Sequence, residues 1–440
     1  MPLFAPPDVG IVQTPQHFFN ADPLQRNLLA TRTWPDEQRF FFNVLLPCKD
    51  AWGAAFCCGT SAVLRLAALE AAGGMATETV TEDMLTTFRM EEHGWRTVFL
   101  NERLSLGLAP EGLAEYVTQR SRWCLGALQQ AYTRWSFLGR GRVGLMNRVS
   151  AFDASLYWSV SFLFRLSVLV GPLLYWWFSI STLTATPLEL LHILAPAVAA
   201  QTIFMSVLAG NRVSPVLTDV SQLLSSVVVL RTVAQVAVKP FGHPFKVTPK
   251  GRSRDRVVVE WGLLLPFLLI ALATAGGMLA NLGVWAPGPG APGYPLNMVW
   301  SLFNLAVMAV AVAACVEMPR PRQEERFAVN AGARLRHAAA GGAEEAACTV
   351  LDLSVTGVRL SFAGPVAPGD RLELELPGSG LALPFEAVRA HGGEISGRFL
   401  ADRATRWELI ALLYTGAFAN EVASVAPMRT LGHAMRRILG

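Results

Sequence analysis

The sequence is short of charge and of cysteine, and each shortage excludes a class of protein. Only 16% of its 440 residues are charged while 52% are hydrophobic, a balance that is typical of membrane proteins and unusual for a soluble chain. Its six cysteines show no zinc-ligand spacing, so a structural zinc site is not expected. The amino terminus has no basic segment followed by an apolar core, so we expect no signal peptide there. The net charge of +4 is modest, and no nucleic-acid-binding signature is present.

What the sequence does contain is a long apolar central region. Four windows, roughly 152–180, 188–210, 260–285 and 296–316, are long and apolar enough to cross about 30 Å of hydrocarbon. The segment 213–238 is also apolar, but two charged residues and two glutamines interrupt it. It therefore predicts an amphipathic helix that lies in the membrane interface and not a fifth span.

The basic residues predict the orientation of these spans. The links 181–187 and 286–295 contain no Lys or Arg, whereas the loop 211–259 contains eight. Under the positive-inside rule this loop is cytoplasmic, and so are both flanking parts and both termini. A cytoplasmic location disfavours disulfides. Arg165, inside the first window, requires a polar partner or a route to the interface.

Residues 1–148 alternate short apolar runs with helical patterns, which favours an α/β fold. The run "DVGIVQTP" predicts a buried strand that ends at a turn. The run "FCCGTSAVLRL" (56–66) predicts a strand, a glycine-containing turn and the start of a helix. Taken alone, Cys57 and Cys58 are small core residues of that strand.

The stretch "TETVTEDMLTTFRMEEHGW" predicts a helix that begins after Thr81 as the N-cap and holds Glu82 and Asp83 in its first turn. Carboxylates in a first turn commonly do no more than compensate the helix dipole. The functional alternative is that the helix end aims a carboxylate into a cleft, where it acts as a base.

The stretch "VTQRSRWCLG" (117–126) crowds polar and aromatic residues together just before the first apolar window. On a helix Gln119, Arg122 and Trp123 share one face, while Arg120 points elsewhere. A guanidinium binds phosphate oxygens, and a flat indole ring stacks on a sugar. The same residues also suit a membrane-interface helix with basic and aromatic anchors, so the stretch alone leaves both possibilities open.

A T-E-D followed about 35 residues later by Q-x-x-R-W, ahead of membrane spans, resembles the processive family 2 glycosyltransferases. The resemblance sharpens to the catalytic subunits of bacterial cellulose synthase. It implies that 1–148 is the carboxy-terminal part of a GT-A glycosyltransferase domain and that 149–317 is an α-helical transmembrane region. Four stretches carry it: "QTPQHFFNADP" (13–23), "FCCGTSAVLR" (56–65), "TVTEDMLT" (79–86) and "QRSRWCLGALQ" (119–129).

The resemblance implies a role for each residue of the site. Asp83 would be the general base that deprotonates the acceptor's 4-hydroxyl as this oxygen attacks the anomeric carbon of UDP-glucose, forming a β-1,4 link with inversion. We expect its first-turn position to keep its pKa low, so that proximity matters more than basicity. Gln119 and Arg122 would hold the diphosphate leaving group. Trp123 would stack under the acceptor glucose at the mouth of a channel through the spans.

Further substrate-site residues are implied beside these. Thr81 and Glu82 belong to the T-E-D motif, and Cys58 would lie near the acceptor terminus. His17 either lines the same cleft or is a satisfied core histidine. Within the cytoplasmic loop, "PFKVTPKG" (244–251) resembles the gating loop of the family, predicted over 240–256. Its flap would close over the nucleotide through Phe245, Val247, Thr248 and Lys250.

By the residues alone, the loop 240–256 is a plain cytoplasmic link whose lysines signal topology.

After the last span, short alternating strands with polar turns over 318–403 predict a small antiparallel barrel. Residues 404–440 predict a helix, about 404–419, and a basic amphipathic surface helix.

Two motifs flank the barrel pattern, and together they resemble a PilZ domain, which binds cyclic di-GMP through arginine contacts to its phosphates and guanines. Arg322 and Arg326 form R-x-x-x-R, which alone would be a solvated juxtamembrane charge cluster. Asp352, Ser354 and Gly357 form D-x-S-x-x-G.

The implied partners are UDP-glucose, the nascent glucan, cyclic di-GMP as activator, a periplasmic regulatory subunit and the lipid of a bacterial inner membrane. Family members also carry a D-D and a D-x-D motif, which bind uridine and Mg²⁺, upstream of the stretch that matches "QTPQHFF". No D-x-D occurs here, so we expect this chain to correspond to the carboxy-terminal part of the enzyme. The alternatives are another processive β-glycan synthase and a non-catalytic membrane receptor for cyclic di-GMP.

Overall fold

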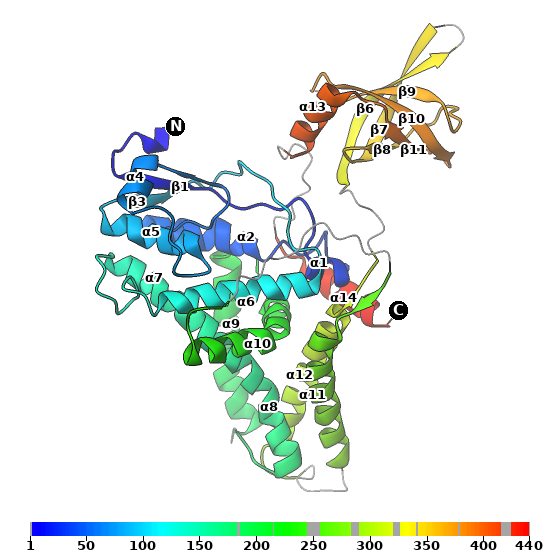
Figure 1. Cartoon of the computed structure of the whole chain (residues 1–440). Coiled ribbons are helices and arrows are strands. Elements are labelled where there is room, and N and C mark those ends of the chain that lie inside the picture. Colours follow the sequence, from blue (N-terminus) through cyan, green and yellow to red (C-terminus); the bar gives the residue numbers. More distant parts are fainter. Residues whose placement is uncertain are drawn as a thin grey trace.

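The computed structural model contains an α/β part, a helical bundle and a barrel (Figure 1). In Figure 1 the α/β part lies beside the upper end of the bundle, and the barrel lies above the bundle. The expected architecture of three parts is confirmed. The structure describes residues 2–182, 185–213, 215–243, 256–282, 290–319, 326–339, 342–376, 379–414 and 424–439.

The α/β part is built around a three-stranded sheet with the order β2-β1-β3. The central strand β1 (Val9–Gln13) is buried along its whole length, as its apolar sequence predicts. It pairs antiparallel with β2 (Ala62–Leu64) and parallel with β3 (Arg96–Phe99). Helices α4 (Leu66–Ala71) and α5 (Glu82–Glu92) lie beside the sheet (Figure 1).

One strand prediction is wrong. Residues 56–58 are not a strand, and the strand β2 begins only after the glycine turn. Side chains take the place of a strand partner here. The backbone N–H of Cys57 donates to Thr87 Oγ1 at 2.9 Å, and that of Cys58 donates to Gln13 Oε1 at 2.8 Å. Because side chains accept hydrogen bonds from these backbone N–H groups, the segment does not need to pair with a neighbouring strand.

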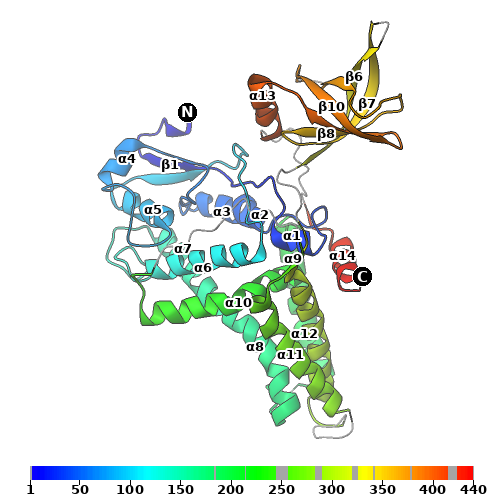
Figure 2. The same ribbon diagram turned by 45° about the vertical axis from the view of Figure 1, so that its right-hand side comes forward.

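Helix α6 (Leu113–Gln130) connects the α/β part to the bundle. It runs alongside α10 (Pro215–Val238) in Figures 1 and 2, and Ser121 of α6 hydrogen-bonds Thr232 of α10 at 2.9 Å. The short elements before and after α6 are η1 (Pro2–Phe4), α1 (Pro23–Asn27), α2 (Gln38–Phe40), η2 (Phe41–Leu45), α3 (Leu46–Ala51), α7 (Leu145–Leu156) and η3 (Tyr157–Ser161).

Five helices of the described part are long and apolar enough to cross a membrane. Four match the predicted windows: α8 (Phe162–Phe178, continuous with α7 and η3), α9 (Pro187–Val207), α11 (Trp261–Ala280) and α12 (Tyr294–Ala314). The fifth is α10, for which an interface helix was predicted and which is also long and apolar enough to span. Its course nevertheless differs, because it crosses the bundle beneath α6 while α8, α11 and α12 run together (Figure 2). An interfacial position of α10 stays a prediction.

The expected polar partner of Arg165 is found on α10. Its guanidinium forms an ion pair with Asp219, and its Nε donates to Gln222 Oε1 at 3.0 Å. These are two of the polar residues that interrupt the apolar pattern of α10. A charge inside an apolar bundle is costly unless it is paired. The contacts of Arg165 avoid this cost, and they also link α8 to α10.

The barrel is closed and antiparallel, with the strand order β10-β11-β8-β7-β6-β9, which confirms the predicted architecture. Alternate apolar side chains of each strand fill its interior. Helix α13 (Arg403–Tyr414) follows the barrel and α14 (Pro427–Leu439) ends the described chain. The strands are β6 (Phe327–Ala339), β7 (Gly342–Leu353), β8 (Gly357–Ser361), β9 (Arg371–Glu375), β10 (Ala382–His391) and β11 (Glu394–Phe399); a short pair, β4 (Val258–Val259) and β5 (Val316–Glu317), joins the ends of α11 and α12.

Candidate functional site

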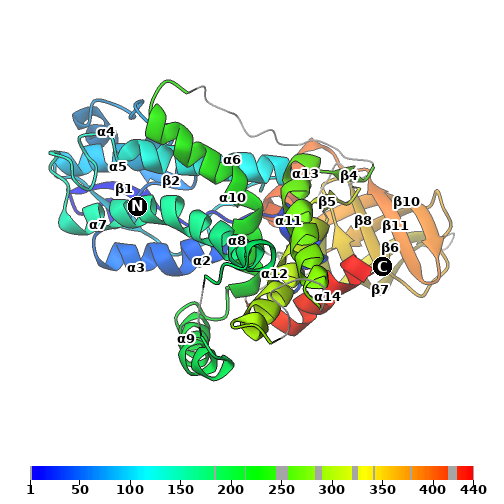
Figure 3. The same ribbon diagram turned by 90° about the horizontal axis from the view of Figure 1, so that it is seen from below.

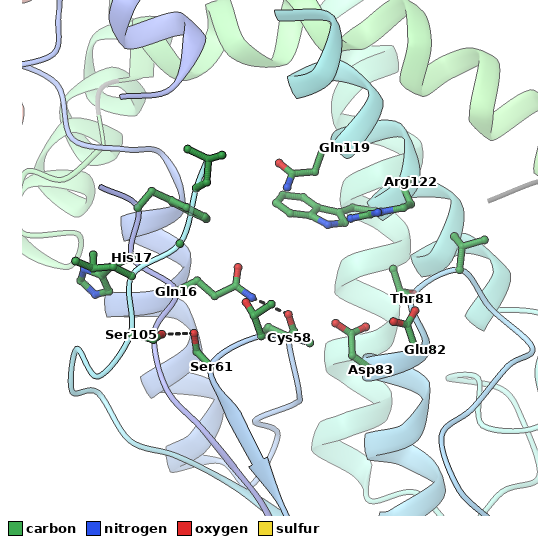
Figure 4. A pocket seen from close by; sticks show the side chains of 18 residues that line it. Gln16, His17, Cys58, Ser61, Thr81, Glu82, Asp83, Ser105, Gln119 and Arg122 are labelled. Carbon is green, nitrogen blue, oxygen red and sulfur yellow. Dashed lines mark hydrogen bonds between the residues drawn. The ribbon is translucent and has the colours of Figure 1, made fainter. Parts of the chain in front are cut away.

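A cavity of about 470 Å³ lies between the amino-terminal end of α5 and one face of α6. Figure 4 shows Asp83 and Glu82 on one side and Gln119 and Arg122 on another, with Cys58 beside Asp83 on the side of Gln16, and His17 farther off. Five segments line the cavity: 16–18, 58–61, 80–83, 105–108 and the α6 residues Gln119, Arg122 and Trp123. The T-E-D and Q-x-x-R-W motifs, separate in sequence, therefore share one cavity.

Thr81 holds the T-E-D motif against α6. It occupies the N-cap position of α5, but its side chain makes no capping hydrogen bond, so the expected capping role is wrong. The side chain packs instead on Gly126, where an added Cβ would come within 2.1 Å of Thr81 Oγ1. The absence of a side chain at residue 126 is thus what allows the two motifs to approach each other.

Asp83 lies in the first turn of α5 and faces the cavity. Its Oδ1 accepts a hydrogen bond of 2.8 Å from the backbone N–H of Met84. Its Oδ2 faces Gly59, where a Cβ would lie only 2.9 Å away. Gly59 has a φ of +84°, a conformation that glycine adopts without strain. The turn after Cys58 therefore leaves room for the carboxylate.

The pKa of Asp83 is not low, contrary to the sequence expectation. Its pKa rises from 3.8 to about 6, chiefly because the carboxyl is buried and to a smaller extent because of the charge of Glu82. The hydrogen bond from Met84 and the positive charge of Arg122 lower it, but they do not outweigh burial. The sequence argument considered the helix end and could not include desolvation. The result is a carboxylate with its pKa near 6, a value suited to a base.

Cys58 is held through its backbone. Its N–H donates to Gln13, and its carbonyl oxygen accepts a hydrogen bond of 2.7 Å from Gln16 Nε2. Burial raises the pKa of its thiol well above 9.0, so the thiol is neutral at physiological pH. Gln16 was not singled out in the sequence, although it belongs to the "QTPQHFF" stretch.

The predicted face of α6 is confirmed as geometry, since Gln119, Arg122 and Trp123 all line the cavity. Arg120 lies on another side, as expected, and forms a 2.5 Å ion pair with Glu37. Its guanidinium lies 4.5 Å from the ring centre of Trp123 and 4.6 Å from that of Tyr116. Arg120 thereby supports Trp123 from behind, a role that the sequence pattern did not reveal.

Gln129 links the T-E-D segment to the start of the predicted gating loop. Its Oε1 accepts from the backbone N–H of Val80 at 2.9 Å, and its Nε2 donates to Pro240 O at 2.8 Å. The side chain is buried. The flap residues themselves lie outside the described residues: Phe245, Val247, Thr248 and Lys250.

A second constellation lies on the barrel. Asp352 accepts from Arg326, with 2.5 Å between Nη1 and Oδ1, and from Arg359, with 2.7 Å between Nε and Oδ2. Ser354 Oγ accepts a 3.1 Å hydrogen bond from the backbone N–H of Gly357, which closes the turn between β7 and β8. The two sequence motifs therefore meet in space. Arg322 lies outside the described residues.

Arg359 was missed by the sequence analysis. Strand register provides the signal, because Arg359 on β8 is the cross-strand partner of Asp352 on β7. No group of three or more His, Cys, Asp or Glu side chains within the described ranges could hold a metal ion. The described residues therefore do not form a site for Mg²⁺.

Two family models match the chain. Residues 1–204 match the model of glycosyl transferase family group 2, and residues 320–414 match the PilZ domain. The chain is also similar to the PilZ domain of a cellulose synthase from a cellulose-synthesizing bacterium, with 22% identity, 20% of this chain and 94% of that one covered, and a TM-score of 0.18.

Similarity to curated proteins extends over most of the chain. The cellulose synthase catalytic subunit of Pseudomonas fluorescens is 29% identical over 416 residues, which cover 93% of this chain and 56% of the relative. Cellulose synthase 1 of Komagataeibacter xylinus is 30% identical over 403 residues, which cover 88% of this chain and 25% of the relative. The chain spans about half or less of the length of these relatives. It is a homologue of the cellulose synthase catalytic subunits, with a family 2 glycosyltransferase segment, apolar helices and a carboxy-terminal PilZ domain.

Proposed function

We propose that this chain acts as a cellulose synthase catalytic subunit, which transfers glucose from UDP-glucose to a growing β-1,4-glucan and extrudes the product across a bacterial inner membrane. The observation that supports this best is the shared cavity. A buried carboxylate, Asp83, and a basic and aromatic face, Arg122 with Trp123, line one hollow above an apolar bundle.

Asp83 acts as the general base. The 4-hydroxyl oxygen of the acceptor glucose forms the new bond to the anomeric carbon, and the bond from that carbon to the diphosphate oxygen breaks with inversion. The hydroxyl proton passes to a carboxylate oxygen of Asp83, and UDP leaves with the bond electrons. A base with a pKa of about 6 is ionised at neutral pH and can still hold the proton transiently.

The face of α6 serves the two substrates. Negative charge grows on the diphosphate as the bond breaks, and Arg122 with Gln119 stabilises it by donating hydrogen bonds. The ring of Trp123 stacks under the acceptor, and the Arg120 guanidinium behind the ring restricts its movement. Thr81, Glu82 and Cys58 complete the wall near the acceptor.

No step is assigned to Mg²⁺, because the sequence has no D-x-D and the described residues form no cluster of metal ligands. In family members the metal compensates charge on the diphosphate. Here the residues that would do so are Arg122 and, on the predicted flap, Lys250.

Cyclic di-GMP controls access to the nucleotide. The dinucleotide binds at Arg326, Asp352, Ser354 and Gly357, and we propose that Arg322 holds the predicted flap shut in its absence. Recruitment of Arg322 by the dinucleotide releases the flap, since one side chain then exchanges between two partners. In this proposal both termini are cytoplasmic, and a periplasmic regulatory subunit receives the glucan.

The test uses the full chain in lipid nanodiscs with UDP-glucose and cyclic di-GMP, and measures glucan that a β-1,4-glucanase digests. Asp83→Asn should reduce transfer by roughly 10² to 10⁴, because it removes the base. It should leave UDP binding, measured separately, within about twofold. Asp153→Asn is the matched control: Asp153 lies on α7, outside the cavity, and its side chain is 72% exposed.

Unchanged transfer by Asp83→Asn would contradict the assignment of the base. A wild-type chain that binds cyclic di-GMP but makes no glucan would favour the alternative of a non-catalytic membrane receptor. A product that resists the glucanase but contains another β-linkage would identify a different β-glycan synthase.

A further inference from the structure

The last helix, α14, is fixed to the rest of the protein along one side. Thr430 and Ala434 on that side are buried. Thr430 Oγ1 donates to Thr33 O at 3.1 Å, and the His433 ring donates from Nδ1 to Leu29 O at 2.8 Å. Arg437 Nη2 donates to Val316 O at 3.2 Å. The helix is therefore part of the folded body and not a loose tail.

These contacts place α14 at a defined level of the molecule. Val316 follows the end of α12 and pairs with β4, which leads directly into Trp261 at the start of α11. Trp261 is 63% exposed, and Leu265 one turn further is 47% exposed. Exposed aromatic and apolar side chains at the end of a span are typical of the boundary between water and lipid. Helix α14 thus lies beside the ends of α11 and α12 that are on the barrel side (Figure 1).

A second side of α14 is apolar and uncovered. Met428, Leu431, Met435 and Ile438 recur at helical spacing and share one face. Met428 is 81% and Met435 58% exposed in the described part of the chain. Viewed along the bundle from below, α14 lies beside α12 (Figure 3).

The remaining side carries positive charge. Arg429 and Arg436 are seven residues apart, so they lie on one face, and both are exposed. They flank the apolar face, as basic residues do on helices that lie in a membrane interface. An apolar face alone would not identify what covers it, but flanking guanidiniums at the level of the span ends fit an anionic lipid surface.

We propose that α14 is an interfacial anchor that binds anionic lipid. The apolar face enters the boundary of the acyl chains, and Arg429 and Arg436 contact lipid phosphates. The anchor fixes the polypeptide just after the PilZ barrel, so the barrel is tethered at both of its ends: by α12 before it and by α14 after it. This inference depends on the membrane location and not on glucosyl transfer.

The test measures the depth of α14 in nanodiscs that contain the full chain. Met435→Cys, in a Cys48→Ser background because Cys48 is exposed, carries an environment-sensitive fluorophore, and the signal of the background without Met435→Cys is subtracted. Lipids with a quencher near the glycerol level should quench this probe severalfold more than one at Glu408→Cys, an exposed position on α13. A probe at Leu265→Cys is the reference within a span. Met428→Cys is a second position on the same face.

Lipid composition separates the two parts of the proposal. Quenching at residue 435 should rise severalfold when phosphatidylcholine is replaced by a mixture with about one third phosphatidylglycerol. Arg429→Gln with Arg436→Gln should abolish that rise, and Arg429→Lys with Arg436→Lys should retain most of it. Quenching as weak as at residue 408 would show that α14 is outside the bilayer. A blue-shifted but unquenched probe would show that protein, and not lipid, covers the apolar face. Equal quenching in both lipid mixtures would show that α14 does not prefer anionic lipid. Any one of these three outcomes would overturn the proposal.

Discussion

At the scale of single residues, the main balance concerns Asp83. Its position near a helix end and near Arg122 favours the ionised form, while burial disfavours it. Burial is the larger effect, and the pKa rises to about 6. The carboxylate would thus be a stronger base than one in water. The carboxylate also requires a glycine at residue 59, because any side chain there would fill the space next to Asp83 Oδ2.

The raised pKa of Asp83 predicts how the reaction depends on pH. Transfer should fall as the pH drops through about 6, because the protonated carboxyl cannot accept the proton. Initial rates with saturating UDP-glucose and acceptor, measured from about pH 5 to 8, report this ionisation. A rate that is constant down to about pH 4.5 would mean that a different group is the base.

The stability of the folded protein should fall as pH rises over part of this range, whereas the transfer rate rises. Between about pH 4 and 6 the carboxyl is protonated in the folded protein and ionised in the unfolded one, so folding becomes less favourable as pH rises. Asp83→Asn lacks this dependence. Its midpoint of thermal unfolding, relative to the wild type, should therefore rise between these pH values.

At the scale of elements, the site depends on how closely α5 and α6 approach. Helix α6 carries Gln119, Arg122 and Trp123 on one face and contacts the T-E-D segment through Gly126. Its last turn connects this segment to Pro240 through Gln129. One helix therefore carries the residues proposed to bind the diphosphate, contacts the T-E-D segment that holds Asp83, and contacts Pro240 at the start of the predicted gating loop.

Gly126→Ala should separate these groups. The new methyl would overlap Thr81, and such overpacking costs about 1–3 kcal/mol. Transfer should fall at least about tenfold with UDP binding less affected, because Asp83 moves away from the acceptor while Arg122 stays on α6. Gly262→Ala is the control, since it also replaces a glycine of a helix by alanine and meets nothing within 4 Å. Equal effects of both substitutions on transfer would mean that the spacing of α5 and α6 is unimportant.

At the scale of the whole molecule, the barrel touches the glycosyltransferase part through aromatic rings. Phe19 lies 4.9 Å from Tyr414 of α13 in an edge-to-face contact, and Tyr414 lies 5.2 Å from Phe327 of β6. Phe327 directly follows Arg326, and Phe19 directly follows the segment 16–18 that lines the cavity. We expect this packed path to transmit changes at the barrel site to the cavity, which the next substitutions test.

Two substitutions should affect the control by cyclic di-GMP in opposite ways. Arg322→Ala should give transfer without the dinucleotide, because the proposed latch on the flap is lost. Tyr414→Ala should leave the affinity for the dinucleotide within about twofold and reduce the activation severalfold, because a truncated ring no longer joins the two parts. UDP release with and without cyclic di-GMP distinguishes the two. An Arg322→Ala variant that stays silent until the dinucleotide is added would rule out the latch, and full activation of Tyr414→Ala would rule out the aromatic path.

Patterns of local spacing sufficed for much of this protein. Apolar length predicted four of the five long apolar helices in the described ranges, and strand alternation predicted the barrel. The spacing of Gln119, Arg122 and Trp123 predicted their common face. These features depend on the helical and strand periods, which are properties of neighbouring residues. The motifs themselves also sufficed to predict the family.

Properties that arise between distant segments had to come from the tertiary structure. The pKa of Asp83 depends on burial by residues far from it in sequence, and the place of Thr81 depends on an opening at Gly126. The same holds for the support of Trp123 by Arg120 and Glu37, and for the pairing of Arg359 with Asp352 across two strands. Local sequence determined which elements form and which side chains each presents, because period and propensity act over a few residues. Packing decided which of those side chains meet and what charge they carry, because desolvation and contact are set by whatever the fold brings alongside.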